Sequence, residues 1–472
     1  MDRDTPTSTG AFYRLSIELI WAIAGRLETD KDLCAFRAVC WTTRNAIDDG
    51  SCSFWRSKFH VKYAMDNDAT KPFYNAVLKK EYQHRAKWLK RGLALSFKDQ
   101  GHSSRELKTL AVLRTLIIES FRGDQKELAS DLHGRPLCPN QMALLNFLLG
   151  ARTFPRVKTT ASSPKRREYE GPNPELAAIR LMVGQLMFHT EAPRYDICYF
   201  EDSQRAVYEH WNRAPIFTGD GDLQVNMEWA LHCFNFFRHH MVREDVNSLY
   251  DAMAALEPGD RPSAWRNQIS QGRSIMSRHW KGTYSYLTHE ELRRLRRDKE
   301  GSDEYFVDKN IDEGENIQDL TLDFKTKGEF TWPEGFETRL QSLRPTMALR
   351  KTRAQYRSSK TEEPPAPILV QGQGRDHDDT FFASGWLNPL APQHGIPGWQ
   401  RVTLMKHYDQ GYDNILEDDL WAYEGVVLPG GRIMLGRWWY ANDEPTDPDY
   451  GSYGGPFILW AVDSAPTFEP ED

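Results

Sequence analysis

The chain changes its hydrophobic pattern near residue 276. Between residues 60 and 275, apolar side chains recur mainly at helical spacing, as they do over residues 107–121. After residue 276, short runs of aromatic and β-branched residues alternate with turn signals, and Pro429-Gly430-Gly431 separates two of these runs as a hairpin turn would. Helices and strands that segregate along a chain indicate an α+β fold. We therefore predict a mainly helical first part, followed by an antiparallel, β-barrel-like domain.

Composition shifts set the expected boundaries. The chain divides into a disordered tail (1–10), a small unit of three helices (11–59), a helical spacer (60–275), the β-rich domain (276–465) and a second tail (466–472). Within the spacer, residues 155–174 are rich in Pro, Ser and charge and are expected to form a surface loop. Glycine recurs around the last strands and suits the bends of a small closed sheet. The Gly-rich segment 372–386 is expected to be a polar loop.

Composition also points away from nucleic acid and membranes. The 472 residues carry a net charge of −7 and a pI near 6.1, so the chain lacks the basic excess that binds nucleic acid or anionic lipid. No apolar run approaches the ~20 residues needed to span a bilayer, and the first ten residues lack the layout of a signal peptide. The six cysteines form no CxxC pair, which is typical of reduced thiols in a cytoplasmic or nuclear protein.

Residues 15–27, LSIELIWAIAGRL, are apolar at nine of thirteen positions. As a helix this segment would carry two apolar faces, whereas a surface helix needs only one to pack on its own domain. A capping pattern at Thr29 starts a second helix, and residues 54–59 add a third short apolar segment. Three helices of this size bury too little apolar surface to be stable without a partner. The second face of the first helix therefore needs a cover.

Specific residues in this unit carry a resemblance. They are Leu15 to Ile20, Ile23, Leu27, Asp32, Leu33, Phe36, Arg37, Val39, Cys40, Arg44, Trp55 and Arg56. This pattern resembles the F-box, although Ser16 replaces the usual proline and supplies an N-cap instead. The resemblance implies docking on a Skp-family adaptor and, through it, on a cullin. The implied adaptor-binding residues are Leu15, Ile17, Leu19, Ile20, Ile23, Leu33, Phe36 and Val39. The alternative is a helical hairpin that packs only on its own chain.

The C-terminal part carries a second resemblance. Trp280, Gly282 and Tyr284, with the segments YEGVVLPGGRIMLGRWW and GPFILW, resemble the substrate-side domain of fungal F-box proteins and, more distantly, the β-barrel of cyclin-binding F-box proteins. This implies that the domain captures a target protein. The residues assigned to target binding are Trp386, Trp421, Arg432, Arg437, Trp438 and Trp460. Because neighbouring strand residues point to opposite faces, Trp438 and Trp439 cannot both lie inside a barrel.

No catalytic or metal-binding motif stands out. Residues 308–319 place three acidic or amide side chains as in a calcium loop, but they lack the glycine and the final glutamate that such a loop requires. We expect no cofactor, no metal and no catalysis, with the chain acting as the substrate-recognition subunit of an SCF-type ubiquitin ligase. Two alternatives stay open. One is an F-box protein that acts outside the ligase, and the other is a hydrolase or ligand-binding protein with a site near residues 376–386, where Asp376, His377, Asp378 and Asp379 cluster.

Overall fold

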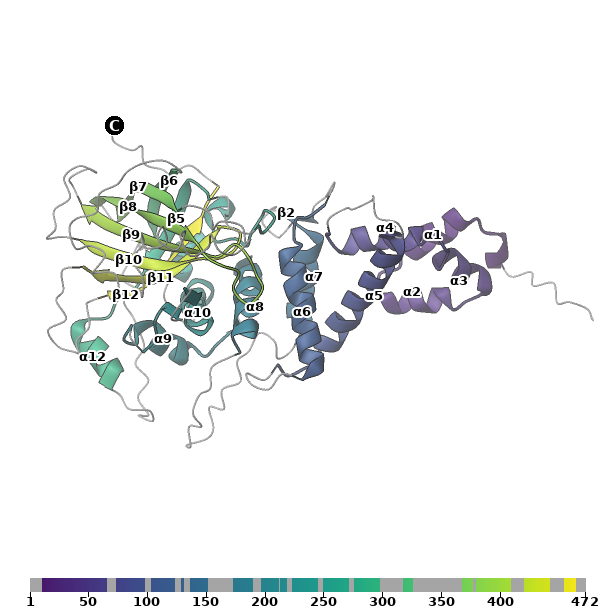
Figure 1. The fold of residues 1–472 in the computed structure, drawn as a ribbon, viewed down its shortest axis with the longest axis horizontal. Helices are drawn as coiled ribbons and strands as arrows, with labels where there is room; N and C mark the ends of the chain where they lie inside the picture. The colour runs from purple at the N-terminus through teal and green to yellow at the C-terminus, as the bar shows by residue number, and fades with distance from the viewer. Residues whose placement is uncertain are drawn as a thin grey trace, which may run out of the picture.

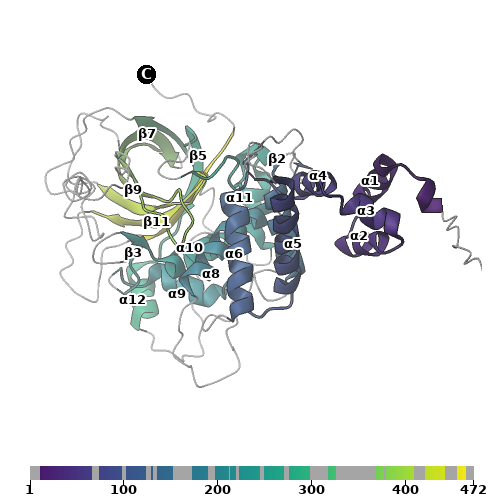
Figure 2. The same ribbon diagram turned by 45° about the vertical axis from the view of Figure 1, so that its right-hand side comes forward.

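The computed structural model describes residues 11–65, 74–97, 103–123, 129–130, 136–151, 173–189, 197–211, 213–218, 223–244, 249–270, 276–297, 317–325, 367–376, 379–408, 420–441 and 454–463. Both expected tails and most of the expected loop 155–174 lie outside these residues. The N-terminal helices lie at one end of the molecule, a β-barrel lies at the other, and further helices connect the two (Figure 1). The second view keeps the same order (Figure 2).

Four short helices follow a 3-10 turn in the N-terminal unit: η1 Ala11–Arg14, α1 Ile17–Gly25, α2 Asp30–Arg37, α3 Trp41–Ile47 and α4 Ser53–Lys62. Ser16 caps α1 by accepting a hydrogen bond from a first-turn amide at 3.4 Å, and Thr29 caps α2 in the same way at 3.1 Å. Both caps were predicted. The sequence predicted three helices here, and it missed α3. This helix begins because the Thr43 hydroxyl accepts a hydrogen bond from the Cys40 amide, which starts a new helix just after α2 ends.

The middle of the chain is helical, as predicted, and it surrounds one almost fully buried helix. Its elements are α5 Tyr74–Gly92, α6 Ser104–Ile118, α7 Pro139–Gly150, α8 Pro174–Gly184, η2 Gln185–His189, α9 Phe200–Tyr208, α10 Met227–Val242, α11 Tyr250–Ala255 and η4 Pro258–Asp260, with the small sheets β1 Ala129–Ser130 and β2 Pro136–Leu137, and β3 Phe217–Thr218 and β4 Gln224–Val225. Asn226 caps α10. Because α10 packs on α8, α9 and the barrel at once, nearly all of its side chains are buried.

Eight antiparallel strands close the C-terminal barrel: β5 His279–Tyr284, β6 Gln318–Lys325, β7 Ile368–Asp376, β8 Asp379–Pro389, β9 Gln400–Tyr408, β10 Trp421–Val427, β11 Ile433–Tyr440 and β12 Gly454–Ala461. Each strand pairs with the next along the chain, and β12 returns to pair with β5. Helix α12 His289–Arg297 lies between β5 and β6 in chain order. The predicted hairpin turn joins β10 and β11, with positive φ at Gly430 and Gly431. The expectation of an α+β chain with an antiparallel barrel is therefore confirmed.

The prediction of a polar loop over residues 372–386 is wrong, because this segment forms the facing parts of β7 and β8. Its glycines face the barrel interior, where backbone or side-chain atoms of neighbouring strands occupy the space that a Cβ would need. A Cβ on Gly374, for example, would lie 2.4 Å from the Phe381 ring. The interior of an eight-stranded barrel is just wide enough for side chains to fill it, so glycines on some strands make room for large residues on others.

Gly436→Ala should destabilise the barrel by about 1–3 kcal/mol. Its Cβ would lie 2.2 Å from the Glu424 carbonyl oxygen and 2.4 Å from the Phe457 ring. Urea unfolding followed by tryptophan fluorescence measures the loss. Gly50→Ala is the matched control, because a Cβ at Gly50 meets nothing within 4 Å. Equal unfolding midpoints for the two variants would show that the barrel interior tolerates the extra methyl group.

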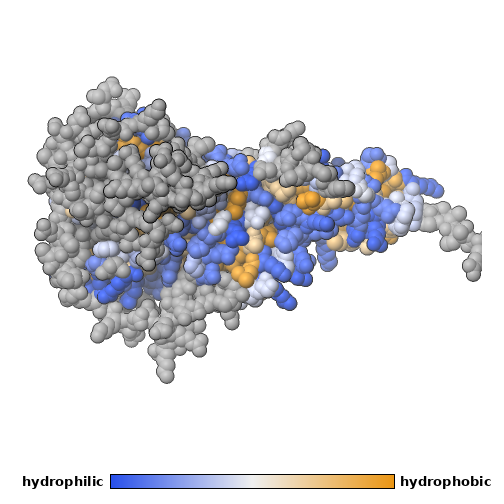
Figure 3. Space-filling model, in the orientation of Figure 1, coloured by the Kyte–Doolittle hydropathy of each residue, from blue (hydrophilic) through white to orange (hydrophobic). Residues whose placement is uncertain are grey.

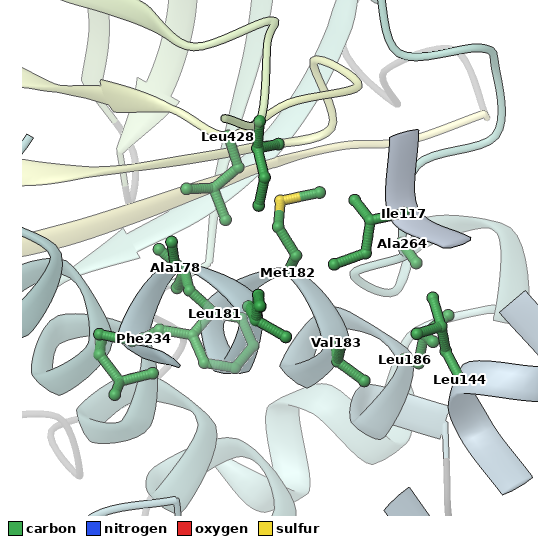
Figure 4. Close-up of a cluster of buried hydrophobic side chains, with 14 of the residues drawn as sticks. Ile117, Leu144, Ala178, Leu181, Met182, Val183, Leu186, Phe234, Ala264 and Leu428 are labelled. Atoms are coloured by element: carbon green, nitrogen blue, oxygen red, sulfur yellow. The ribbon is translucent and has the colours of Figure 1, made fainter. Parts of the chain in front are cut away.

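Three buried clusters include residues of the barrel wall, and the two largest lie on its opposite faces. Outer-face residues of the last strands, such as Leu435, join α8 and α10 in a cluster that continues through the middle helices to Leu33 of α2. In Figure 4, Met182 of α8 extends toward Leu428, which follows β10. The alternate strand residues, such as Met434, fill the barrel interior. The helices of the middle part therefore share one continuous core with both the barrel and the N-terminal unit.

Candidate functional sites

Large apolar side chains are concentrated on the surface of the N-terminal helices. Six of the thirteen exposed ones in the described part of the chain lie between positions 13 and 41: Tyr13, Ile17, Leu19, Ile23, Val39 and Trp41. We call these six the N-terminal apolar set. Trp41 is 71% exposed and Leu19 is 54% exposed, and apolar surface is visible at this end of the molecule (Figure 3). Exposed apolar patches mark sites where proteins bind partners.

The eight residues predicted to contact an adaptor divide by depth. Ile20 and Leu33 are buried, and Leu15 and Phe36 are half-buried. The remaining four are exposed: Ile17, Leu19, Ile23 and Val39. The sequence pattern identified core residues and surface residues together. It could not tell one kind from the other, because apolar residues occur on most sides of α1. It also missed two exposed residues, Tyr13 and Trp41, which lie in η1 and in the unpredicted α3.

A charged pair lies inside one end of the barrel. Lys406 of β9 donates to Asp376 of β7, with 2.6 Å between Nζ and Oδ2, and each side chain is 6% exposed. The hydroxyls of Tyr284 and Tyr408 approach the same carboxylate oxygen at 3.3 and 3.4 Å. Because the strands run alternately up and down, β5, β7 and β9 all end here, where β10 begins. We call the group the barrel-end cluster: Tyr284, Asp376, Phe381, Lys406, Tyr408, Trp421, Tyr423 and Trp438.

Aromatic rings enclose the charged pair. The Lys406 ammonium lies 4.1 Å from the centroid of the Phe381 ring, which is a cation–π arrangement. Trp438 packs edge-on against Tyr284, with ring centroids 5.3 Å apart, and contacts Trp421 at 5.4 Å. Phe381 and Trp438 are buried, and three half-buried residues surround them as a rim: Tyr284, Tyr408 and Trp421. The sequence analysis did not identify Lys406 and Tyr408. The one available signal was that both lie at every second position from Val402 and Leu404 in QRVTLMKHY, and therefore on the same face of the strand.

Burial controls the protonation of this cluster. It lowers the pKa of Lys406, and the Asp376 carboxylate opposes that shift. Burial, followed by the charge of Asp376, raises the pKa of Tyr408, so this phenol stays a proton donor at neutral pH. Gln318 of β6 is 4% exposed on the same inner face, and its Nε2 has no hydrogen-bond partner among the described residues. An aromatic site with a few polar donors of this kind can hold an apolar group that carries a hydrogen-bond acceptor.

The structure places only two of the six residues assigned to target binding in this cluster, namely Trp421 and Trp438. Trp386 and Trp460 are buried on the outer face of the barrel, and the Trp460 indole donates to a backbone carbonyl at 2.8 Å. Arg432 donates to the carbonyl of Ala461 at 2.7 Å and to a serine hydroxyl at 3.1 Å. Its contacts therefore tie the β10–β11 turn to the end of β12.

The sixth residue, Arg437, lies on the outer face of β11 and lines two adjoining hollows. They hold about 360 and 280 Å³ of empty space, including the part that is open to solvent. Arg437, Trp211 and Trp439 line both hollows, and we call the two together the outer pocket. Trp439 lies here while Trp438 lies inside the barrel, as strand alternation predicts.

The described acidic side chains of the segment considered for hydrolysis, Asp376 and Asp379, do not point toward one another. Asp376 points into the barrel, whereas Asp379, which lies opposite it in the hairpin, is exposed. His377, Asp378 and most of residues 308–319 lie outside the described part of the chain. Within the described ranges, no group of three or more His, Cys, Asp or Glu residues is placed to hold a metal ion. No described helix has the length and apolar character needed to cross a membrane.

Comparison with known proteins found no match, either among family models, among curated proteins or among solved structures. The features that bear on function are therefore the N-terminal apolar set, the barrel-end cluster and the outer pocket.

Proposed function

We propose that this chain is the substrate-recognition subunit of an SCF-type cullin–RING ubiquitin ligase, acting in the cytoplasm or nucleus. The observation that supports this most directly is the N-terminal apolar set, which lies on short helices at the end of the molecule opposite the barrel (Figures 1 and 2). A Skp-family adaptor would cover that set, and the barrel would bind the target. The chain itself performs no chemistry, since ubiquitin transfer belongs to its partners.

The layering of the N-terminal unit supports docking. Leu19 and Ile23 are one turn apart and share a side of α1, while Ile20 and Leu33 pack beneath the surface. The small unit therefore already has a core, and its exposed apolar side chains are available to a partner without any unfolding. Burying such side chains in an interface is the main favourable term in protein association.

The barrel-end cluster supports target capture. Its rim combines three aromatic side chains, Tyr284, Tyr408 and Trp421, and its inner face holds the Gln318 amide donor. Tyrosine and tryptophan are enriched where proteins bind other proteins, because each offers a large apolar area with a polar group. The continuous core between the barrel and the N-terminal helices would fix the distance between target and adaptor.

Leu19→Asp should abolish capture of a purified Skp-family adaptor by the full-length chain. A carboxylate buried without a partner in an apolar interface costs several kcal/mol, so the affinity should fall by about 100-fold or more. Titration calorimetry measures the dissociation constant. Leu19 is 54% exposed, so the substitution removes surface and leaves the core intact.

Leu107→Asp on α6 is the matched control, because Leu107 is 48% exposed and lies outside the N-terminal apolar set. This variant should bind the adaptor as the unchanged protein does. Circular dichroism checks that both variants are folded. The proposal fails if the unchanged chain does not bind the adaptor at micromolar concentration, or if both variants bind equally well.

A further inference from the structure

The guanidinium of Arg437 is buried with most of its donors unused. The residue is 6% exposed, and its Nη2 donates to the Ala206 carbonyl at 3.2 Å. Its Nε and Nη1 have no hydrogen-bond partner among the described residues. Arg401, on a nearby strand, also has Nη1 and Nη2 atoms without a partner in the described part of the chain, but its Nε pairs with the Glu424 carboxylate at 2.7 Å. A buried charge with unsatisfied donors is costly, and a ligand that accepts hydrogen bonds would remove that cost.

The charges around the outer pocket leave an excess of positive charge. Arg296 of α12 and Glu209, at the end of α9, line the same hollow as Arg437, and Glu209 also pairs with Arg213 at 3.6 Å. In the second hollow, Glu424 is neutralised by Arg401. Burial lowers the pKa of Arg437 to about 9, and Arg296 adds to that shift. Because both glutamates have arginine partners, an anionic group on the ligand would balance the remaining positive charge.

Apolar walls flank the unused donors. Trp439 is buried, and Trp211 is 37% exposed. Pro215, Ile216 and Phe217 line the second hollow. Arginine binds carboxylates especially well because the hydrogen bonds are charge-assisted. We propose that the outer pocket binds a monocarboxylate carried on an aromatic or aliphatic body, with the carboxylate on Arg437 and the apolar body against Trp211.

This site does not depend on the proposed ligase role, because Arg437 and Trp211 belong neither to the N-terminal apolar set nor to the barrel-end cluster, although Trp438 also lines one of the two hollows. A small free acid and the terminal carboxylate of a peptide present the same chemical group. The test therefore uses one probe for each source: 3-phenylpropionate for the free acid and N-acetylphenylalanine for the peptide end. Each is paired with its neutral amide, and inorganic phosphate serves as an anion without an apolar body.

Binding to the full-length chain is measured by titration calorimetry and by the shift in unfolding temperature. The acids should bind and stabilise, and the amides should bind about 10- to 100-fold more weakly, because hydrogen bonds to charged groups contribute that much. Tighter binding of 3-phenylpropionate would identify a free acid as the ligand. Tighter binding of N-acetylphenylalanine would identify a peptide end.

Arg437→Met should remove acid binding. Arg437 lies 5.1 Å from the centroid of the Trp229 ring, a contact that an apolar side chain can also make. Without ligand, this variant should therefore unfold at the same or a higher temperature, because an apolar side chain replaces a buried charge that is not paired with a carboxylate among the described residues. Arg294→Met is the control, since Arg294 is exposed on α12 beside the pocket, and acid binding should persist in it.

Four results would overturn the proposal. The first is no binding of either acid at millimolar concentration. The second is equal binding of acids and amides, and the third is phosphate binding more tightly than both acids. The fourth is acid binding retained in Arg437→Met, which would place the carboxylate elsewhere.

Discussion

Lys406→Met should lower the free energy of unfolding by about 3–5 kcal/mol. The substitution leaves the Asp376 carboxylate, which is 6% exposed, inside the barrel without the Lys406 cation, and the Tyr284 and Tyr408 hydroxyls stay near it at 3.3 and 3.4 Å. It also removes a cation from the face of the Phe381 ring. Urea denaturation of the full-length protein, followed by tryptophan fluorescence, measures the change.

The double variant Asp376→Asn/Lys406→Met tests whether the lost stability comes from leaving the Asp376 charge without its partner. It should recover most of the lost stability, because replacing both members of a buried pair with neutral groups is close to neutral. Lys325→Met is the matched control on the same barrel. Lys325 is exposed, and losing its ammonium should change stability by less than about 0.5 kcal/mol. A Lys406→Met variant as stable as Lys325→Met would contradict a functional or structural role for the pair.

The strands that could be predicted are those whose own residues specify them. The segments that became β9, β10, β11 and β12 contain β-branched and aromatic runs bounded by turns, and all four were expected. The segments of β7 and β8 contain Gly372, Gly374 and Gly385 and were expected to form a loop. These glycines are compatible with strands because atoms of neighbouring strands occupy the space beside them, such as the Phe381 ring at Gly374 and the Thr403 carbonyl at Gly385. That information lies in the packing and cannot be read from the local pattern.

The candidate sites also divide into residues that the local sequence could predict and residues that only the folded structure brings together. Leu19 and Ile23 were expected in an interface because their own segment is too apolar for a one-sided helix. Asp376 and Lys406 lie thirty positions apart, and only the register of the barrel brings them together. Arg437 could have been an exposed strand residue in an isolated barrel. It is buried because the helices pack against the outer face of β11 and β12, so its unsatisfied donors appear only once those helices are in place.

The protein should lose stability steeply as the pH falls from about 6.5 to 4. His232 and His240 lie on the buried helix α10 and are 3% and 1% exposed. Burial lowers the pKa of His232 to about 4, and burial, with His239 nearby, lowers the pKa of His240 to about 3. Both values lie below the ordinary 6.5, so the unfolded chain binds more protons in this window and acid favours unfolding. Each histidine should cost about 1.4 kcal/mol per pH unit there, and neither should contribute above it.

His240→Phe tests the cause of that slope. The rings of Phe200 and Phe236 lie 5.1 and 5.0 Å from His240, so phenylalanine keeps an aromatic ring in the cluster and removes the titrating group. The variant should lose about 1.4 kcal/mol less per pH unit between pH 6 and 4 than the unchanged protein, as measured by urea midpoints. His289→Phe is the control, because His289 is exposed at the start of α12, and its slope should not change. If His240→Phe and the unchanged protein had the same slope, the acid sensitivity would have to come from groups other than His240.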